Sequence, residues 1–226
     1  MSDCIDRETF TKTFEDHNAK CCEILKCRND ITYFIEHYVT LPNGGKIVLK
    51  DWQKEYLKHL VDGNDAILSD KQQSGKTTIN VIYVIWSANF HPQSRCTFIT
   101  CVQQISHALK IMIDILNLLP RWLCSALGDD IHMKHICFSN GSIIVITSAN
   151  GVFCGYWPGR TLVLDDVELY PKNNFDNVYY GLVPVLKSYR NSQLIMTYSS
   201  GSNTCRISEL IMNAAIRGQL FFGEIK

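Results

Sequence analysis

The sequence has no excess of charge of either sign and no apolar run long enough to span a membrane. Lys and Arg together number 22, as do Asp and Glu, so the formal net charge is zero. A neutral chain neither indicates nor excludes a nucleic-acid partner, because a local basic patch can exist on it. The most apolar stretch, residues 79–90, is too short for a membrane helix and is interrupted by Asn80 and Ser87.

A secretory signal, internal repeats and long linkers are also missing. Residues 1–10 are polar and acidic, whereas a secretory signal has a basic start and an apolar centre. The 226 residues suffice for one sizeable domain with at most a small appendage. With 46% hydrophobic and 19% charged residues, the composition is ordinary for a globular protein. We therefore expect a cytosolic globular protein.

Ten cysteines would suit a disulfide scaffold, but such scaffolds are usually short secreted chains. Several cysteines lie in or beside apolar segments, where a reduced cysteine behaves as a small core residue. A group near the N-terminus is a candidate metal site, although it lacks the paired two-residue spacing of zinc ribbons and fingers. We predict helix packing rather than zinc binding for this group: Cys4, Cys21, Cys22 and Cys27, with His17 nearby.

A helical N-terminal segment is followed by alternating strand and helix patterns. Residues 6–38 space aromatic and aliphatic side chains by three and four, a short alternating run follows at 46–49, and a second helix is predicted at 51–61. Asn140-Gly141 between two apolar runs predicts a hairpin. This order predicts an α/β fold with a mostly parallel sheet covered on both faces, where ligands bind beyond the carboxyl ends of the strands. The predicted strands are 66–69, 97–101, 136–138, 143–147, 161–164, 194–197 and 220–225, and the helices among them are 76–88, 102–118 and 207–217.

A candidate phosphate-binding loop links the first predicted strand to the helix that follows. In such loops, successive backbone N–H groups and the positive end of the helix hold the β- and γ-phosphates of a nucleotide. Gly75 lets the backbone wrap closely, Lys76 supplies a positive charge, and the hydroxyl of Thr77 is a ligand for Mg²⁺. Asp70 replaces the first glycine of the common pattern, and a chance Ser-Gly-Lys-Thr at a helix start is the alternative. The predicted nucleotide contacts are Lys71, Gln72, Gln73, Ser74, Gly75, Lys76, Thr77 and Thr78.

Two acids, Asp165 and Asp166, end the buried strand predicted at 161–164. In P-loop enzymes one such acid holds Mg²⁺ and its neighbour orients or deprotonates the attacking water. We assign Asp165 to the metal and Asp166 to catalysis. Many such enzymes have Glu in the second place, which is one methylene longer, and Glu168 could compensate if the chain stays extended. The alternative is a strand that merely ends at an Asp-Asp turn.

With both motifs placed, residues 27–226 resemble the ATPase domain of tailed-bacteriophage large terminases, the motors that package DNA. The segments 33–39 and 49–53 are similar to the entry segment of that family, in which a Gln contacts adenine; here that residue is Gln53. The family's coupling motif senses the γ-phosphate and passes hydrolysis on to movement. Further matching segments, in the family's order, are the loop at 73–78, a helix end at 118–123, a hairpin at 138–142 and the coupling motif with Thr197, Ser199 and Ser200.

The resemblance implies a P-loop NTPase fold of the ASCE or RecA-like kind, with residues 1–30 as a helical extension and 31–226 as the ATPase domain. It implies hydrolysis of ATP with Mg²⁺, which powers translocation of viral double-stranded DNA into a procapsid. The implied partners are the portal, the procapsid, a small terminase subunit and further copies of the chain in a ring, in the cytoplasm of an infected bacterium. The family's nuclease half is absent, which implies an excised domain or a nuclease carried by another chain.

Three departures from the family pattern bear on hydrolysis. Gln72 stands where the family usually has a basic residue, with Lys71 adjacent. A Val-Arg-Gly motif appears at 152–155 without its arginine; Arg160 could substitute, and a merely solvated Arg160 is the alternative. Asp166 replaces the usual Glu. We therefore expect slow hydrolysis, or hydrolysis that depends on an arginine from a neighbouring subunit.

Two other interpretations remain open. A helicase-like nucleic-acid ATPase also uses an adenine-reading Gln and an acidic strand end, but normally carries a second ATPase-like domain. A weakly or non-hydrolysing assembly subunit would keep the loop for nucleotide-gated binding, and the missing arginines and Asp166 favour it. A phosphate-release assay with and without DNA and portal separates the three interpretations.

Overall fold

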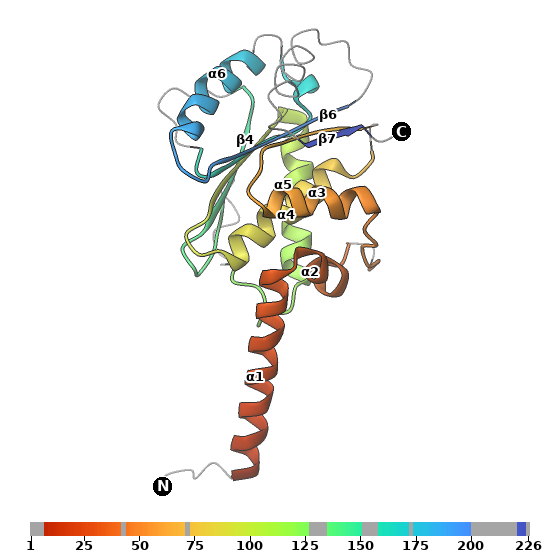
Figure 1. The fold of residues 1–226 in the computed structure, drawn as a ribbon, viewed down its shortest axis with the longest axis vertical. Helices are drawn as coiled ribbons and strands as arrows, with labels where there is room; N and C mark the ends of the chain where they lie inside the picture. The colour runs from red at the N-terminus through yellow and green to blue at the C-terminus, as the bar shows by residue number, and fades with distance from the viewer. Residues whose placement is uncertain are drawn as a thin grey trace.

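The computed structural model describes most of the chain, and its elements are labelled as in Figure 1. Predictions that involve Lys71, Gln72, Ser200 and the segments 152–155 and 207–217 lie outside the described residues. The described backbone covers residues 7–41, 44–70, 73–126, 135–150, 158–171, 174–199 and 221–224.

The centre of the molecule is a seven-stranded sheet with the order β3-β4-β2-β5-β6-β1-β7. β3 pairs antiparallel with β4, and the other neighbouring pairs are parallel. β6 lies between β1 and β5, so the carboxyl ends of these three strands meet at one edge of the sheet. The strands are β1 Ala66–Asp70, β2 Arg95–Thr100, β3 His135–Cys137, β4 Ile143–Ser148, β5 Thr161–Leu164, β6 Gln193–Ser199 and β7 Phe221–Glu224.

Helices cover the sheet on both faces, with α3, α4 and α5 on one side and α6 on the other (Figure 1). Successive strand residues point to opposite faces, and β5 shows this directly. Val163 packs into the larger core beneath α4, whereas Leu162 and Leu164 pack into the smaller core beneath α6. The predicted α/β fold is therefore confirmed. The helices are α1 Arg7–Asn29, α2 Ile31–Tyr38, α3 Asp51–Val61, α4 Lys76–Phe90, α5 Val102–Leu118 and α6 Asn174–Lys187, with the 3₁₀ turn η2 at Val167–Leu169.

α4 is the central helix of the larger core, and its sequence explains its position. Only Thr77, Thr78 and Ser87 of its residues escape burial, so nearly every face of the helix is covered. A helix that is apolar all round packs inside the protein rather than at its surface. This burial fixes the direction of α4, and with it the place where its N-terminus meets the edge of the sheet.

The predicted N-terminal helical region is two helices. Asp30 separates them, and its side chain accepts hydrogen bonds from the backbone N–H groups of Thr32 and Tyr33, at 2.8 and 3.0 Å. Such a carboxylate satisfies free N–H groups at the start of α2 and also ends the helix before it. α1 extends away from the rest of the molecule (Figure 1), while its last turn enters the core. There Cys27 is fully buried, and its carbonyl accepts a 2.8 Å hydrogen bond from Trp86 Nε1.

The other N-terminal cysteines do not share that environment. Cys21 and Cys22 are exposed, and Cys21 Sγ lies 3.7 Å from Nε2 of His17. Cys4 lies outside the described residues. Among the described residues, no three His, Cys, Asp or Glu side chains are grouped so that they could hold a metal ion. Nor is any described helix both long and apolar enough to cross a membrane.

Sequence patterns gave most elements but missed two. The strand 161–164 and the helices 51–61 and 102–118 match β5, α3 and α5 at both ends. α6 and the 3₁₀ turn η2 were not predicted. Pro184 lies inside α6, and a proline in a helix interior normally weakens the helix. The local sequence therefore does not predict a helix here. The run at 46–49 is not a strand; only an isolated bridge joins Lys46 to Thr40.

Candidate active site

The phosphate-loop segment joins the carboxyl end of β1 to the N-terminus of α4. Gly75, the residue before the helix, has φ 94°, and Gln73 has φ 63°. Gly75 is required for its backbone angle rather than for space, since a Cβ there would meet only Gln53 Nε2 at 3.7 Å. The first N–H groups of α4 have no partner within the helix, and they form the positive end of the helix dipole. This is the geometry that binds phosphate.

The side chain of Asp165 lies opposite this helix start. It is fully buried at the tip of β5. Its Oδ2 accepts a 2.8 Å hydrogen bond from the hydroxyl of Thr77, and its Oδ1 accepts one of 2.7 Å from the hydroxyl of Thr197. Thr77 is in the first turn of α4 and Thr197 is in β6, so three elements converge on one carboxylate.

The metal assigned to this place fits the residues that are present. Hydroxyl and carboxylate oxygens are the donors that Mg²⁺ prefers, and Thr77 and Asp165 supply one of each in direct contact. Burial, and next the negative charge of Asp166, raise the pKa of Asp165 above its usual value. A divalent cation would oppose both effects, because it stabilises the ionised carboxylate. The charge balance of the site therefore favours a bound cation.

Asp166 lies beside Asp165 but faces the pocket. Its backbone is left-handed, with φ 49° and ψ 53°, and its N–H donates a 3.0 Å hydrogen bond to the hydroxyl of Thr197. Non-glycine residues adopt this conformation rarely, and they are frequent at functional sites. Burial raises the pKa of Asp166, and the charge of Glu168 raises it further. The turn thus separates the two acids, one inside the protein and one in the pocket.

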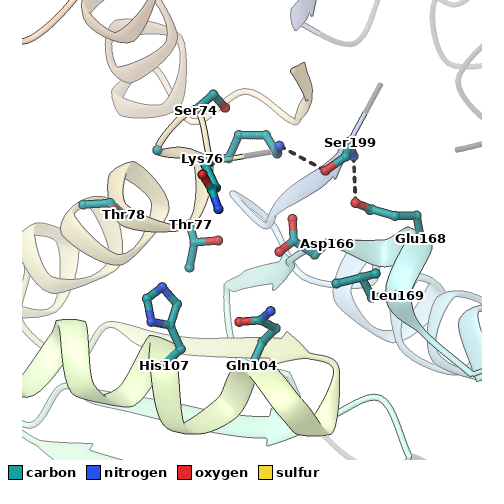
Figure 2. Close-up of a pocket in the computed structure, with 12 residues that line it drawn as sticks. Ser74, Lys76, Thr77, Thr78, Gln104, His107, Asp166, Glu168, Leu169 and Ser199 are labelled. Carbon is teal, nitrogen blue, oxygen red and sulfur yellow. Dashed lines mark hydrogen bonds between the residues drawn. The ribbon is translucent and has the colours of Figure 1, made fainter. Parts of the chain in front are cut away.

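Lys76, Ser199 and Glu168 form a chain of contacts across the pocket (Figure 2). Nζ of Lys76 donates to Oγ of Ser199 at 3.4 Å, and the backbone N–H of Ser199 donates to Oε1 of Glu168 at 2.9 Å. The condition under which Glu168 could compensate, an extended chain after Asp166, is not met, because Glu168 lies in the 3₁₀ turn η2. The Glu168 carboxylate therefore contacts Ser199 at the end of β6. It lies beside Asp166 and does not occupy the position of the Asp166 carboxylate.

A cavity of about 410 Å³ lies among these groups. Two lining residues, Ser74 and Glu168, each have a buried side-chain oxygen, Oγ and Oε2, without a hydrogen-bond partner in the described part of the chain. The cavity brings together the predicted loop, Asp166, Glu168 and Ser199. Its lining residues are Gln73, Ser74, Gly75, Lys76, Thr77, Thr78, Gln104, His107, Asp166, Glu168, Leu169 and Ser199.

Two further predicted residues lie outside the cavity lining. Gln53, on α3, lies next to Gly75, and its Oε1 accepts a 3.0 Å hydrogen bond from the N–H of Lys50. A contact of Gln53 with adenine stays a prediction. Arg160 is exposed and precedes β5, so it lies at the opposite edge of the sheet from Asp165. Five residues of extended chain span about 16 Å, and the structure does not bring Arg160 into this pocket.

Two lining residues that sequence reasoning missed, Gln104 and His107, come from the first turns of α5. Their sequence signal was weak, since polar residues at the start of an amphipathic helix are usually solvated. The signal that could have found them is their position in the fold. α5 directly follows β2, and β2 lies parallel and next to β5, so the start of α5 is near the carboxyl end of β5, where Asp165 and Asp166 lie. That adjacency needs the strand order and cannot be read from spacing alone.

The chain matches solved structures of phage proteins, while no protein-family model matches it. The HK97 bacteriophage large terminase has a TM-score of 0.73 at 17% identity, over 86% of this chain and 43% of that one. The large terminase of the thermophilic bacteriophage D6E has a TM-score of 0.61 at 11% identity, over 78% and 45%. The UvsW helicase of bacteriophage T4 has 0.54 at 12% identity, over 87% and 67%.

At these identities the matches show the fold. The chain has the P-loop α/β fold that phage large terminases and a phage helicase share, so the resemblance inferred from the motifs is confirmed as a likeness of fold. The chain spans less than half the length of the two terminases. One D6E terminase structure, with a TM-score of 0.56 at 14% identity, is a complex with ADP.

Proposed function

We propose that this chain hydrolyses ATP to drive viral double-stranded DNA into a procapsid, as the ATPase part of a large terminase. One observation carries the proposal: the hydroxyl of Thr77 donates a 2.8 Å hydrogen bond to Asp165. This contact joins the start of α4 to the acidic end of β5, and it supports a triphosphate site in which these two segments act together. Residues 73–78 and Asp166 line one cavity of about 410 Å³.

In the proposed complex, the phosphates of ATP lie along residues 73–78 and the base lies near Gln53. Backbone N–H groups of the loop hold the β- and γ-phosphates, and the buried ammonium of Lys76 neutralises their charge. Thr77 and Asp165 would hold Mg²⁺, which supplies charge neutralisation at the β- and γ-phosphate oxygens when it is bound. The predicted contacts of Lys71 and Gln72 belong to the same loop.

Asp166 is the proposed catalytic base. Its carboxylate accepts a hydrogen bond from a water in line with the γ-phosphate, and it takes the proton as the water oxygen bonds to phosphorus. The bond from the γ-phosphorus to the bridging oxygen breaks, and ADP leaves with that electron pair. The left-handed turn at Asp166 supports this role, since it directs the side chain into the pocket while Asp165 stays buried.

Loss of phosphate would be sensed by the end of β6. Ser199 contacts Lys76, and Thr197 contacts both acids, so the two residues touch groups whose charge balance changes on hydrolysis. Ser200, next in the chain, completes the proposed coupling motif. Because β6 lies between β1 and β5, a shift of its end would reach both halves of the site.

Packaging implies partners: double-stranded DNA, a portal and procapsid, and a small terminase subunit. It also implies a ring of copies in the cytoplasm of an infected bacterium. Arg160 lies away from the pocket, and in the proposed ring a neighbouring copy would supply an arginine. The UvsW match keeps a helicase-like ATPase as the second candidate.

Phosphate release from Mg²⁺-ATP tests the proposal, with the chain alone, with double-stranded DNA, and with DNA plus portal-bearing procapsids. We expect release that stops when EDTA removes Mg²⁺ and that rises most with DNA and procapsids together. Full stimulation by DNA alone, together with strand separation, would indicate the helicase-like ATPase. Binding of Mg²⁺-ATP without release in any mixture would indicate a nucleotide-gated assembly subunit.

A further inference from the structure

The first turns of α5 close the pocket on the side away from the phosphate loop, and they do so with two polar side chains (Figure 2). Gln104 and His107 are the residues of α5 that line the cavity. Because they are three positions apart on a helix, they lie on the same face. Both side chains point toward Thr77 and Asp166.

Within the described part of the chain, the side chains of Gln104 and His107 form no hydrogen bond, and they are not buried. α5 packs on the rest of the core through an apolar stripe that includes Ala108, Met112 and Ile115. Packing therefore explains the apolar stripe and leaves the two polar groups facing the pocket unexplained.

The position of His107 relates it to Asp166 and Lys76, because all three residues line the same cavity. His107 and Lys76 come from different elements, α5 and α4. A γ-phosphate in the cavity would therefore lie between Lys76 on one wall and His107 on another.

We propose, on the basis of the ATPase function above, that Gln104 and His107 form the γ-phosphate side of the site. The amide oxygen of Gln104 accepts a hydrogen bond from the attacking water, whose other hydrogen is directed at Asp166. A ring N–H of His107 donates to a γ-phosphate oxygen. As the water oxygen bonds to phosphorus and ADP leaves, the proton passes to Asp166, and His107 stabilises the charge on the transferring group.

Gln104 fits this role because a water needs more than one fixed acceptor to be held in line. Asp166 offers one acceptor from a short side chain on a fixed turn. Gln104 offers a second from across the pocket. Its amide N–H₂ can also donate to a phosphate oxygen, which neither acid can do when ionised.

The sequence offers a matched control for this inference. Gln103 is the same residue type, one position earlier on α5, exposed and not part of the cavity lining. The wild type, Gln103→Ala, Gln104→Ala, His107→Ala and His107→Gln would be compared in the full chain. The measurements are phosphate release from Mg²⁺-ATP, and calorimetric affinities for ADP and for the β,γ-imido analogue of ATP.

We expect Gln104→Ala and His107→Ala to lower kcat by about ten- to a hundredfold, because each removes one group from the transition-state shell. Affinity for ADP should not change, since ADP has no γ-phosphate, while His107→Ala should weaken binding of the imido analogue by about two- to tenfold. His107→Gln, which keeps a donor, should recover part of the loss. Gln103→Ala should match the wild type.

Failure of the inference differs from failure of the proposed function. If the wild type releases phosphate and Lys76→Ala stops it, but Gln104→Ala and His107→Ala behave like Gln103→Ala, the α5 inference is wrong and the ATPase stands. If the wild type releases no phosphate, the ATPase proposal fails. The difference between ADP and imido-analogue affinities then still decides whether His107 contacts a γ-phosphate.

Discussion

Thr197 in β6 donates a 2.7 Å hydrogen bond from its hydroxyl to the buried carboxylate of Asp165 at the tip of β5. The same hydroxyl accepts a 3.0 Å hydrogen bond from the N–H of Asp166. One side chain therefore fixes the orientation of the buried acid and the turn that exposes its neighbour. Ser199, two residues later on the same face of β6, contacts Lys76. A single strand thus joins both acids to the phosphate side of the pocket.

Replacement of Thr197 by Val keeps the shape of the side chain and removes both hydrogen bonds. The buried Asp165 carboxylate and the Asp166 N–H each lose a partner, so we expect a loss of about 1–3 kcal/mol in the free energy of unfolding. ATP turnover should fall with it, because the turn at Asp166 is no longer fixed. Urea unfolding and phosphate release measure the two effects. Thr197→Ser keeps the hydroxyl and is the control. If the Val and Ser variants have the same free energy of unfolding and the same ATP turnover, the role assigned to Thr197 is wrong.

Lys76→Ala should abolish the ATPase activity of the assembled motor. Lys76 is 4% exposed at the start of α4, and no other described Lys or Arg lines the cavity. Its loss leaves the phosphate charge without its main counter-charge. Lys58→Ala, at an exposed position on α3, is the control for loss of a lysine. Wild-type turnover in the Lys76 variant would refute the assignment of the loop.

Asp166→Asn should separate nucleotide binding from hydrolysis. The amide is nearly isosteric with the carboxylate and cannot take a proton, so kcat should fall by about 10²- to 10⁴-fold. Affinity for Mg²⁺-ATP should stay close to the wild-type value, since Asp165 and Thr77 keep their contact. Calorimetry measures the affinity for Mg²⁺-ATP, and phosphate release on the same preparation measures kcat. Loss of binding with the Asn variant would mean that the roles of the two acids are reversed.

Glu23 should make the packing of α1 on α2 sensitive to acid. Its carboxylate accepts hydrogen bonds from Lys26 Nζ at 2.6 Å, from Tyr38 at 2.7 Å and from Tyr33 at 2.8 Å, and these lower its pKa to about 2. Because the pKa is lower in the folded state, this stabilisation is complete above pH 4.5 and is lost as pH falls toward 2.

The Glu23→Gln variant tests that expectation. It should be less stable than the wild type at pH 7, and the difference should shrink as pH falls below 4.5. Urea unfolding at a series of pH values measures the difference. The control is Asp16→Asn, whose exposed carboxylate pairs with Lys20 four residues along the helix, and which should change stability little at any pH. A constant Glu23→Gln difference from pH 7 to pH 3 would contradict the assignment.

Local patterns were sufficient for the two motifs because each motif lies within one short segment. Both motifs are recognised from adjacent residues alone: a glycine before Lys76, and two acids after an apolar strand. In the structure Gly75 directly precedes α4, and Asp165 directly follows β5, as predicted. η2 could not be predicted in this way. Its turn places Glu168 against the N–H of Ser199, a partner 31 residues away, so the conformation at 167–169 depends on β6. Pro184 inside α6 likewise hid a helix that is stabilised by packing on the smaller core.

The sequence by itself determined the alternation of strands and helices, the conformation of the loop before α4 and the presence of two acids at a strand end, because these depend on periodicity and on local backbone chemistry. Only the tertiary structure decided that β6 lies between β1 and β5, that Thr197 contacts both acids, and that α5 brings Gln104 and His107 to the pocket. It also placed Arg160 at the other edge of the sheet. The reason is physical: strand order is fixed by the burial of side chains far apart in the chain, and the residues that share an edge follow from that order.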